Sequence, residues 1–163
     1  MNVVLASAAF WALGTYSLMG DDGTLETVNF RARFRRLKTS ERRAMDSRLR
    51  ANGLAPEVRV MLRERLADPK AGYSATERKA LEADVEAEPI SDEEFLRELL
   101  VDWDLKDKQG NPVTYSPAVK AQVCEDWDGF EAALVTSYMK ARDAALNPKE
   151  VEKNSGEPSA TTS

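Results

Sequence analysis

The sequence contains no histidine, and Cys124 is the single cysteine among its 163 residues. Without histidine the chain lacks the commonest general base and metal ligand of proteins, so the usual catalytic triads and zinc sites would have to be built without it. A lone cysteine cannot form an internal disulfide, which is typical of proteins from a reducing compartment such as the cytosol. The absence of histidine weakens every enzyme hypothesis, and the single cysteine favours the cytosol.

Motifs of cofactor and metal chemistry are missing as well. The chain has no phosphate-binding P-loop and no GxGxxG, CxxC or HExxH motif. Asp102 and Asp104 could ligate a hard cation, but the sequence around them lacks the alternating oxygen ligands of an EF-hand. We therefore predict a protein that is not an enzyme, with no catalytic residue, no cofactor and no metal ion.

Long apolar runs are also absent. Residues 3–13 form an apolar run around Phe10 and Trp11, but no basic segment precedes it, and it is well short of the ~20 residues that span a bilayer. We expect a buried or partner-covered segment here, whose role the sequence leaves open. No membrane association is expected.

Strong basic charge is lacking too, because the net charge is -5 and the pI is near 5.0. This acidic balance gives no overall signature of nucleic-acid binding, whereas 42% hydrophobic and 31% charged residues are typical of a globular protein. At this length the chain suits one domain with a conventional core. We predict a single helix-rich domain over residues 1–148, protein partners, and a polar, disordered tail over residues 149–163.

A β-hairpin is predicted at about residues 14–36, because two stretches of strand-forming residues flank the turn residues Gly20, Asp21, Asp22 and Gly23. Side chains alternate across a strand. The alternation puts Val28, Phe30, Ala32 and Phe34 on one face and Asn29, Arg31, Arg33 and Arg35 on the other. The three arginines favour either a docking surface for an acidic partner or phosphates, or a solvated edge that prevents strand association.

Helical periodicity follows the hairpin. Helices are predicted to begin near Ser40, Pro56, Ser74, Ser91, Ser116 and Asp128. Three of them carry capping-box pairs, namely Ser74 with Glu77, Ser91 with Glu94, and Asp128 with Glu131. In the helix from Pro56 to Ala67, the residues expected to face inward are Val58, Met61, Leu62 and Leu66.

The helix that begins at Ser91 has the clearest pattern. Its core-facing side is predicted to consist of Phe95, Leu96, Leu99, Leu100 and Trp103. The helix is expected to end before the polar loop at Gly110, Asn111 and Pro112. The predicted fold class is therefore mainly α, with an N-terminal β-hairpin packed on a bundle of about five to six short amphipathic helices.

The sign of the local charge changes along the chain. Residues 31–50 are densely basic, whereas residues 82–104 carry ten acidic residues against the single base Arg97. This asymmetry allows pairing within one molecule, head-to-tail contacts between copies in a homo-oligomer, or two solvated faces.

Large aromatic side chains gather in the C-terminal third of the chain. They serve either as core or as anchors of a protein interface. With the hairpin arginines they make up the candidate partner-binding residues Arg31, Arg33, Arg35, Trp103, Tyr115, Trp127 and Tyr138.

The order of several motifs resembles a known family. Residues 90–117 read ISDEEFLRELLVDWDLKDKQGNPVTYSP, an acidic helix that leads through a tryptophan and a QGNP loop to an aromatic-Ser-Pro helix start. Upstream the chain reads FRARFRRLKTSER, and downstream it reads DWDGFEAALVTSY. In this order, over roughly residues 16–145, the motifs are similar to those of the small tail assembly chaperones of long-tailed, siphovirus-like bacteriophages.

The resemblance implies a non-enzymatic assembly factor that binds and solubilises the tape measure protein and promotes assembly of the tail tube. Its partners would be the tape measure protein and the tail tube protein. It would act in the host cell cytoplasm and be absent from the mature virion, and many members of the family also have a longer, frameshifted form. The alternative is a small helical regulatory or nucleic-acid-associated module that uses the basic region 31–50, which the acidic net charge disfavours.

Overall fold

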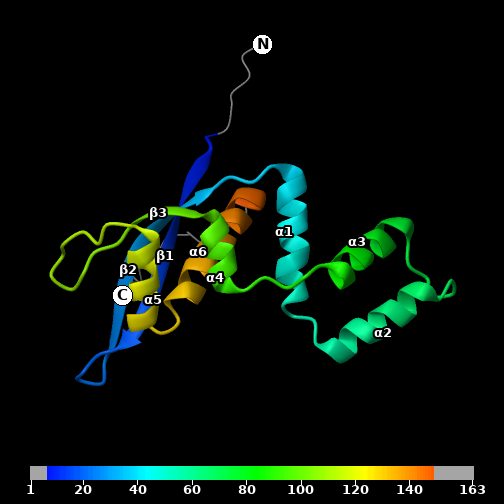
Figure 1. The fold of residues 1–163 in the computed structure, drawn as a ribbon, viewed down its shortest axis with the longest axis horizontal. Helices are drawn as coiled ribbons and strands as arrows, with labels where there is room; N and C mark the ends of the chain where they lie inside the picture. The colour runs from blue at the N-terminus through cyan, green and yellow to red at the C-terminus, as the bar shows by residue number, and fades with distance from the viewer. Residues whose placement is uncertain (1–6, 149–163) are drawn as a thin grey trace, which may run out of the picture. The chain divides into compact units, whose positions relative to one another are not determined.

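Figure 1 shows the fold of the chain in a computed structural model, which describes residues 7–148. The chain forms two compact units. The first unit comprises the residues up to Arg35 together with those from Leu96 onward, and the second unit is Arg36–Phe95. The elements within residues 7–148 are, in order, β1 (Ala9–Met19), β2 (Leu25–Arg35), α1 (Thr39–Ala51), α2 (Pro56–Ala67), α3 (Ala75–Glu86), α4 (Asp92–Leu99), β3 (Leu100–Asp104), α5 (Pro117–Asp126) and α6 (Phe130–Leu146). The single domain stays a prediction, and the predicted disordered tail lies outside the described residues.

The N-terminal hairpin is present, and its first strand begins earlier than predicted, at Ala9. β1 pairs antiparallel with β2 over their full lengths, from Ala9 opposite Arg35 to Met19 opposite Leu25. The predicted turn closes with a hydrogen bond from the Gly23 amide to the Gly20 carbonyl. Gly23 has φ 77°, a backbone conformation that residues with a side chain rarely adopt.

The predicted fold class is wrong, because the chain continues from α4 into a third strand. β3 pairs antiparallel with β2, so a three-stranded antiparallel sheet in the order β1-β2-β3 replaces a lone hairpin on a helix bundle. The residues from Leu100 to Trp103 were expected to extend the helix, and they lie in this strand instead. Within residues 7–148 the fold combines this sheet with six helices, which makes it α+β.

A β-bulge explains why β3 has the spacing of a helix. Arg33 lies opposite Asp102, and Phe34 lies opposite Leu100, so Val101 is the extra residue in β3. The bulge turns the two-residue step of a strand into a three-residue step between the buried residues Leu100 and Trp103. That step is also the spacing of one helix face. All five predicted core-facing residues are therefore buried, although two of them are in a strand.

The core of the first unit lies between the sheet and α6 and is built from aromatic rings. Phe130 at the start of α6 is fully buried. Its ring centroid lies 5.3 to 6.0 Å from those of Tyr16, Phe30, Trp103 and Trp127. Further along α6, Tyr138 makes an edge contact with Phe34 at 5.2 Å. Such pairs of rings stabilise a core beyond the area that they bury.

The predicted serine caps of α3, α4 and α5 are present, and the cap predicted for α6 is not. The Ser74 hydroxyl accepts from the Glu77 amide, and the Glu77 carboxylate accepts from the Ser74 amide, which completes the predicted capping box of α3. Ser116 caps α5 in the predicted way. The box predicted at Asp128 is wrong, because α6 begins after Gly129, which has φ 81° and provides no side-chain cap.

The second unit contains α1, α2 and α3, in which α3 packs against both α1 and α2. The predicted bounds of α2 are confirmed. Its predicted inward face is correct only in part, since Leu62 and Leu66 are half-buried, whereas Val58 and Met61 are 38% and 51% exposed. Hydrogen bonds from Arg59 connect α2 to the ends of α1 and α3. Its guanidinium donates to the carbonyl oxygens of Val85, Ala87 and Ala51, which end α3 and α1.

Candidate partner-binding face of the sheet

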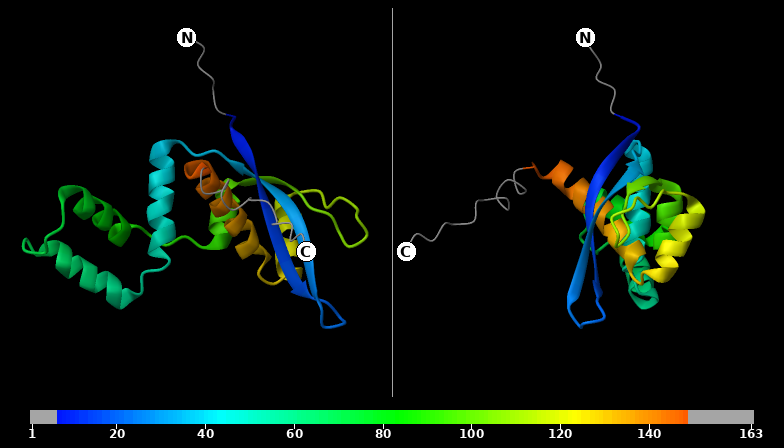
Figure 2. Two further views of the ribbon diagram at one scale, coloured as in Figure 1. Left: turned by 180° about the vertical axis from the view of Figure 1, so that it is seen from behind. Right: turned by 90° about the vertical axis from the view of Figure 1, so that its left-hand side faces the viewer.

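The three-stranded sheet has one covered face and one open face. Ala12 and Tyr16 in β1 and Phe30, Ala32 and Phe34 in β2 are buried on the face that α6 covers. In the left view of Figure 2, β1 and β2 lie in front of α5 and α6, so the open face is turned toward the reader. The predicted alternation in β2 is confirmed, because the residues between the buried ones are exposed.

Two apolar side chains of β1 lie on the open face. Leu13 is 75% exposed and Trp11 is 42% exposed. The register places Trp11 opposite Arg33 and Leu13 opposite Arg31. The open face therefore combines apolar surface with cationic groups, a composition that is common where proteins bind other proteins.

Trp11 organises the two nearest arginines. The guanidinium carbons of Arg31 and Arg33 lie 5.1 and 5.9 Å from the centroid of the Trp11 ring, within the range of cation–π attraction. Arg31 also donates to Asp104 in β3 at 2.9 Å, and both side chains are about half exposed. An exposed ion pair of this kind contributes only ~0–1 kcal/mol. Its main effect is to hold the guanidinium in place over the ring.

The open face brings the predicted arginines together. Arg31, Arg33 and Arg35 are all exposed on one side of β2. Their side chains follow one another along the strand, because residues i and i+2 share a face. The assignment of these three residues to a partner-binding surface stays a prediction.

The predicted aromatic residues lie elsewhere. Trp103 and Tyr138 are 5% and 4% exposed, so their rings belong to the core and offer little surface to a partner. Trp103 donates from its indole nitrogen to the Val113 carbonyl at 2.6 Å. Its ring also meets that of Tyr115 edge to face at 5.2 Å.

Tyr115 and Trp127 are half-buried and also make internal contacts. The Tyr115 hydroxyl donates to the Leu100 carbonyl at 3.2 Å, and burial raises its pKa, followed by the nearby charge of Asp102. Trp127 stacks on Tyr16 with centroids 5.5 Å apart and an interplanar angle of 3°. Neither ring lies on the open face of the sheet.

Sequence reasoning missed the role of Trp11 and Leu13. The apolar run of residues 3–13 was expected to be buried or covered, and its second half from Ala9 is the start of β1. The signal was available, because Trp11, Leu13 and Thr15 alternate with the buried positions of the same strand.

The basic region 31–50 is partly paired with the acidic region 82–104. Arg50 makes two bonds to the Asp84 carboxylate at 2.8 and 2.9 Å, and Arg48 binds Glu94 at 3.0 Å. Arg31 pairs with Asp104, as described above. Of the three arrangements that the charge asymmetry allows, the structure shows pairing within one molecule. These ion pairs reduce the positive charge that residues 31–50 could offer to nucleic acid. The geometry therefore does not support the alternative of a regulatory or nucleic-acid-associated module.

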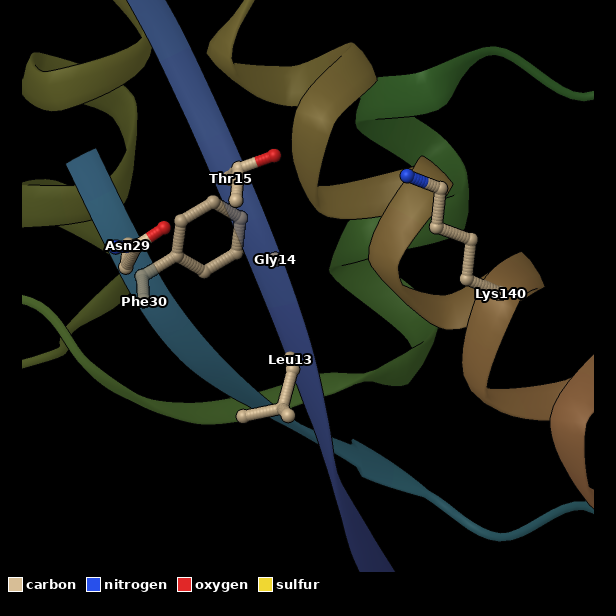
Figure 3. Close-up of a pocket in the computed structure, with 6 residues that line it drawn as sticks. All are labelled: Leu13, Gly14, Thr15, Asn29, Phe30 and Lys140. Carbon is tan, nitrogen blue, oxygen red and sulfur yellow. The ribbon is translucent and has the colours of Figure 1, made fainter. Parts of the chain in front are cut away.

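A shallow pocket of about 290 Å³ adjoins the middle of β1. Figure 3 shows its lining residues Leu13, Gly14, Thr15, Asn29, Phe30 and Lys140. The amine of Lys140 reaches from α6 toward β1, and the other five residues belong to the hairpin. The pocket has one charged group and therefore no arrangement for chemistry on a substrate.

Cys124 is a half-buried free cysteine of α5. Burial, followed by the nearby charge of Glu131, raises the pKa of the half-buried Cys124 thiol to about 11, so it stays protonated at neutral pH. Among residues 7–148, no group of three or more cysteine or acidic side chains is arranged to hold a metal ion. No helix in the same part of the chain combines the length and apolar character needed to cross a bilayer.

Comparison with known proteins gives no relative, since no family model, no curated protein and no solved structure matches the chain.

Proposed function

We propose that this protein is a non-enzymatic binding protein that acts as a tail assembly chaperone of a long-tailed bacteriophage. In this role it binds the tape measure protein, keeps it soluble and promotes assembly of the tail tube, in the host cell cytoplasm and without remaining in the virion. The ordered resemblance over residues 16–145 supports the family. The open face of the sheet supports binding as the activity.

The single observation that carries the binding role is the exposed cluster of Trp11, Leu13, Arg31 and Arg33 on the open face. A tape measure protein is a long helical protein whose apolar stripes are exposed until the tube encloses them. Trp11 and Leu13 can cover such a stripe, while the arginines pair with carboxylates beside it. Aromatic and arginine side chains are the residue types that dominate binding energy at protein interfaces.

The test is co-expression with the tape measure protein of the same phage. The wild-type protein is expected to keep the tape measure protein in the soluble fraction as a multi-copy complex. The triple variant Arg31→Glu, Arg33→Glu, Arg35→Glu and the single variant Trp11→Ala are expected to lose most of the soluble partner.

A matched control carries the same change of charge away from the face. Arg43, Lys70 and Lys79 are exposed cations of the second unit, and their joint replacement by Glu is expected to leave the partner soluble. The proposal fails if the tape measure protein aggregates equally with and without the wild-type protein. It also fails if finished tails retain this protein as a stoichiometric component.

A further inference from the structure

A second hollow lies on the open face of the sheet. It has a volume of about 240 Å³ and is lined by Leu13, Asn29, Phe30, Arg31, Asp104 and Lys106. These residues belong to the three strands or, in the case of Lys106, follow β3 directly, and each of them except Phe30 is exposed. The first pocket, drawn in Figure 3, includes Lys140 of α6, whereas no helix contributes to the second hollow.

The polar groups of the second hollow differ in how they are engaged. The Arg31 guanidinium binds Asp104 at 2.9 Å and lies over the Trp11 ring, so its position is fixed. Within residues 7–148, the Lys106 amine and the Asn29 amide make neither an ion pair nor a side-chain hydrogen bond. The backbone of Lys106 is held by a bridge to Pro112. The hollow therefore has a fixed guanidinium beside donors that remain available to a partner.

The charge of the hollow selects the group that it can bind. Arg31 and Lys106 are cationic and Asp104 is anionic, so one positive charge remains. A single carboxylate neutralises that charge, and it accepts hydrogen bonds from guanidinium, amine and amide groups. A phosphate group brings more negative charge than these side chains balance. Leu13 is 75% exposed beside the cations, so the hollow fits a carboxylate that is attached to an apolar segment.

We propose that the second hollow binds a Glu or Asp side chain of the partner, on one flank of an amphipathic helix whose apolar stripe covers Trp11 and Leu13. The inference rests on the proposed function, which supplies the helical partner. It goes further by assigning a carboxylate site to Asn29, Arg31 and Lys106.

The spacing of the open face matches a helix that lies along β1. Trp11 and Leu13 are about 6.6 Å apart along the strand, at roughly 3.3 Å per residue. Residues four apart in a helix are about 6 Å apart along its axis, so apolar residues at i and i+4 can contact both side chains. Arg31 lies opposite Leu13 in β2. Arg33 lies opposite Trp11, so both cations are on the same side of the stripe. The partner's carboxylates are therefore expected on one flank only.

The experiment measures binding of the purified full chain to overlapping peptides that together cover the tape measure protein of the same phage. The wild-type protein is expected to bind peptides with apolar residues four apart and carboxylates on one flank. Fluorescence anisotropy of the best-binding peptide then gives the Kd of each variant. Lys106→Glu reverses a charge in the hollow and is expected to raise the Kd about tenfold or more.

The matched control is Lys108→Glu. It makes the same change two residues further on, outside the hollow, where Lys108 forms an exposed ion pair with Glu26 at 3.7 Å. This variant is expected to raise the Kd less than about threefold. Thermal melting at the wild-type temperature shows that both variants are folded.

Charge reversal in the peptide identifies the bound carboxylate. In the Lys106→Glu variant, Arg31 is the single cation against two anions, so the hollow carries one negative charge. Replacement of one peptide carboxylate by lysine is therefore expected to restore binding to this variant and to weaken binding to the wild-type protein. The same replacement on the opposite flank of the peptide is expected to do neither.

Equal Kd values for the wild-type protein and Lys106→Glu overturn the inference. It is also overturned if no lysine-substituted peptide restores binding, or if carboxylates on both flanks matter equally. These outcomes leave the proposed function standing, because the peptide still binds. If no peptide of the tape measure protein binds the wild-type chain, the proposed function fails and the inference fails with it.

Discussion

Gly14 of β1 and Phe30 of β2 lie opposite each other in the hairpin, and the ring of Phe30 fills the space in which a side chain at Gly14 would begin. A β-carbon at Gly14 would lie closer to Cζ and Cε2 of Phe30 than carbon atoms can approach. Phe30 also packs edge to face on Phe130 at 5.3 Å, so the ring has little freedom to move. The glycine thus lets a large ring cover the middle of an edge strand.

This contact predicts that Gly14→Ala destabilises the protein. The added methyl group must displace a buried ring in a close-packed core, which typically costs about 1–3 kcal/mol of unfolding free energy. Chemical denaturation measures the loss. Gly53→Ala is the matched control, because a β-carbon there meets only the Arg50 carbonyl oxygen at an ordinary 3.6 Å. Equal stabilities of the two variants would show that the Phe30 ring moves aside freely.

The buried residues of α4 give a second prediction. Phe95 and Leu99 are fully buried, so Phe95→Ala or Leu99→Ala is expected to lower the free energy of unfolding by roughly 2–5 kcal/mol. Leu146→Ala makes the same truncation at a residue that is 55% exposed, and it should cost less than about 0.5 kcal/mol. A loss at Leu99 as small as the loss at Leu146 would contradict the burial of α4.

The faces of the elements could be predicted from the sequence more reliably than the elements themselves. In β2 the two-residue period separates the arginines from the buried residues without ambiguity, and the structure agrees. The start of α4 was also predictable, since the Ser91 hydroxyl accepts from the Glu94 amide. The other half of that predicted box is replaced by a bond from Arg48 to Glu94, a contact distant in sequence that local spacing cannot reveal.

The third strand could not be predicted from spacing alone. A bulged strand and a helix both place apolar residues three apart, so the pattern from Leu100 to Trp103 fits either. Pairing with β2 decides between them, and this pairing joins residues about seventy positions apart, such as Arg31 and Asp104. Strand pairing between distant segments leaves little trace in a local pattern.

The residues of the candidate site could also be predicted only in part from local spacing. The arginines were found because they share one strand, whereas Trp11 joins them through a neighbouring strand. Conversely, the four predicted aromatics pack within the first unit, and abundance in one part of the sequence does not distinguish core from surface. Exposure depends on which face of the sheet α6 covers, which only the tertiary structure shows.

A third prediction concerns the arginines of α2. Arg59 donates to the carbonyl oxygens of Val85 and Ala87, and Arg59→Ala removes this donor from both partly buried acceptors. Its third acceptor, the Ala51 carbonyl oxygen, keeps a bond from the Leu54 amide. The expected loss is about 1–3 kcal/mol. Arg63, one turn further on, makes one exposed ion pair with Glu86, and Arg63→Ala should cost at most ~1 kcal/mol. Thermal and chemical unfolding of both variants give the comparison, and a larger loss for Arg63→Ala would contradict this role of Arg59.

The last prediction follows from the pKa of Cys124. Burial and the charge of Glu131 raise the pKa of this thiol to about 11 from its ordinary value of 9.0. Because only the thiolate attacks alkylating reagents, the folded protein is expected to react much more slowly near neutral pH than the unfolded protein does.

The sign of the effect on stability follows from linkage. The folded pKa lies above the unfolded value, so the contribution of the thiol is fully present below about pH 9 and is lost as the pH rises toward about 11. Tyr16 and Tyr115 have raised pKa values as well, so stability should fall in this range even without the thiol. Cys124→Ala is therefore the control, and its unfolding free energy should fall less steeply with pH than that of the wild-type protein. Parallel curves for the two proteins, or alkylation as fast in the folded state as in denaturant, would show that the thiol is not shielded by α5 and α6.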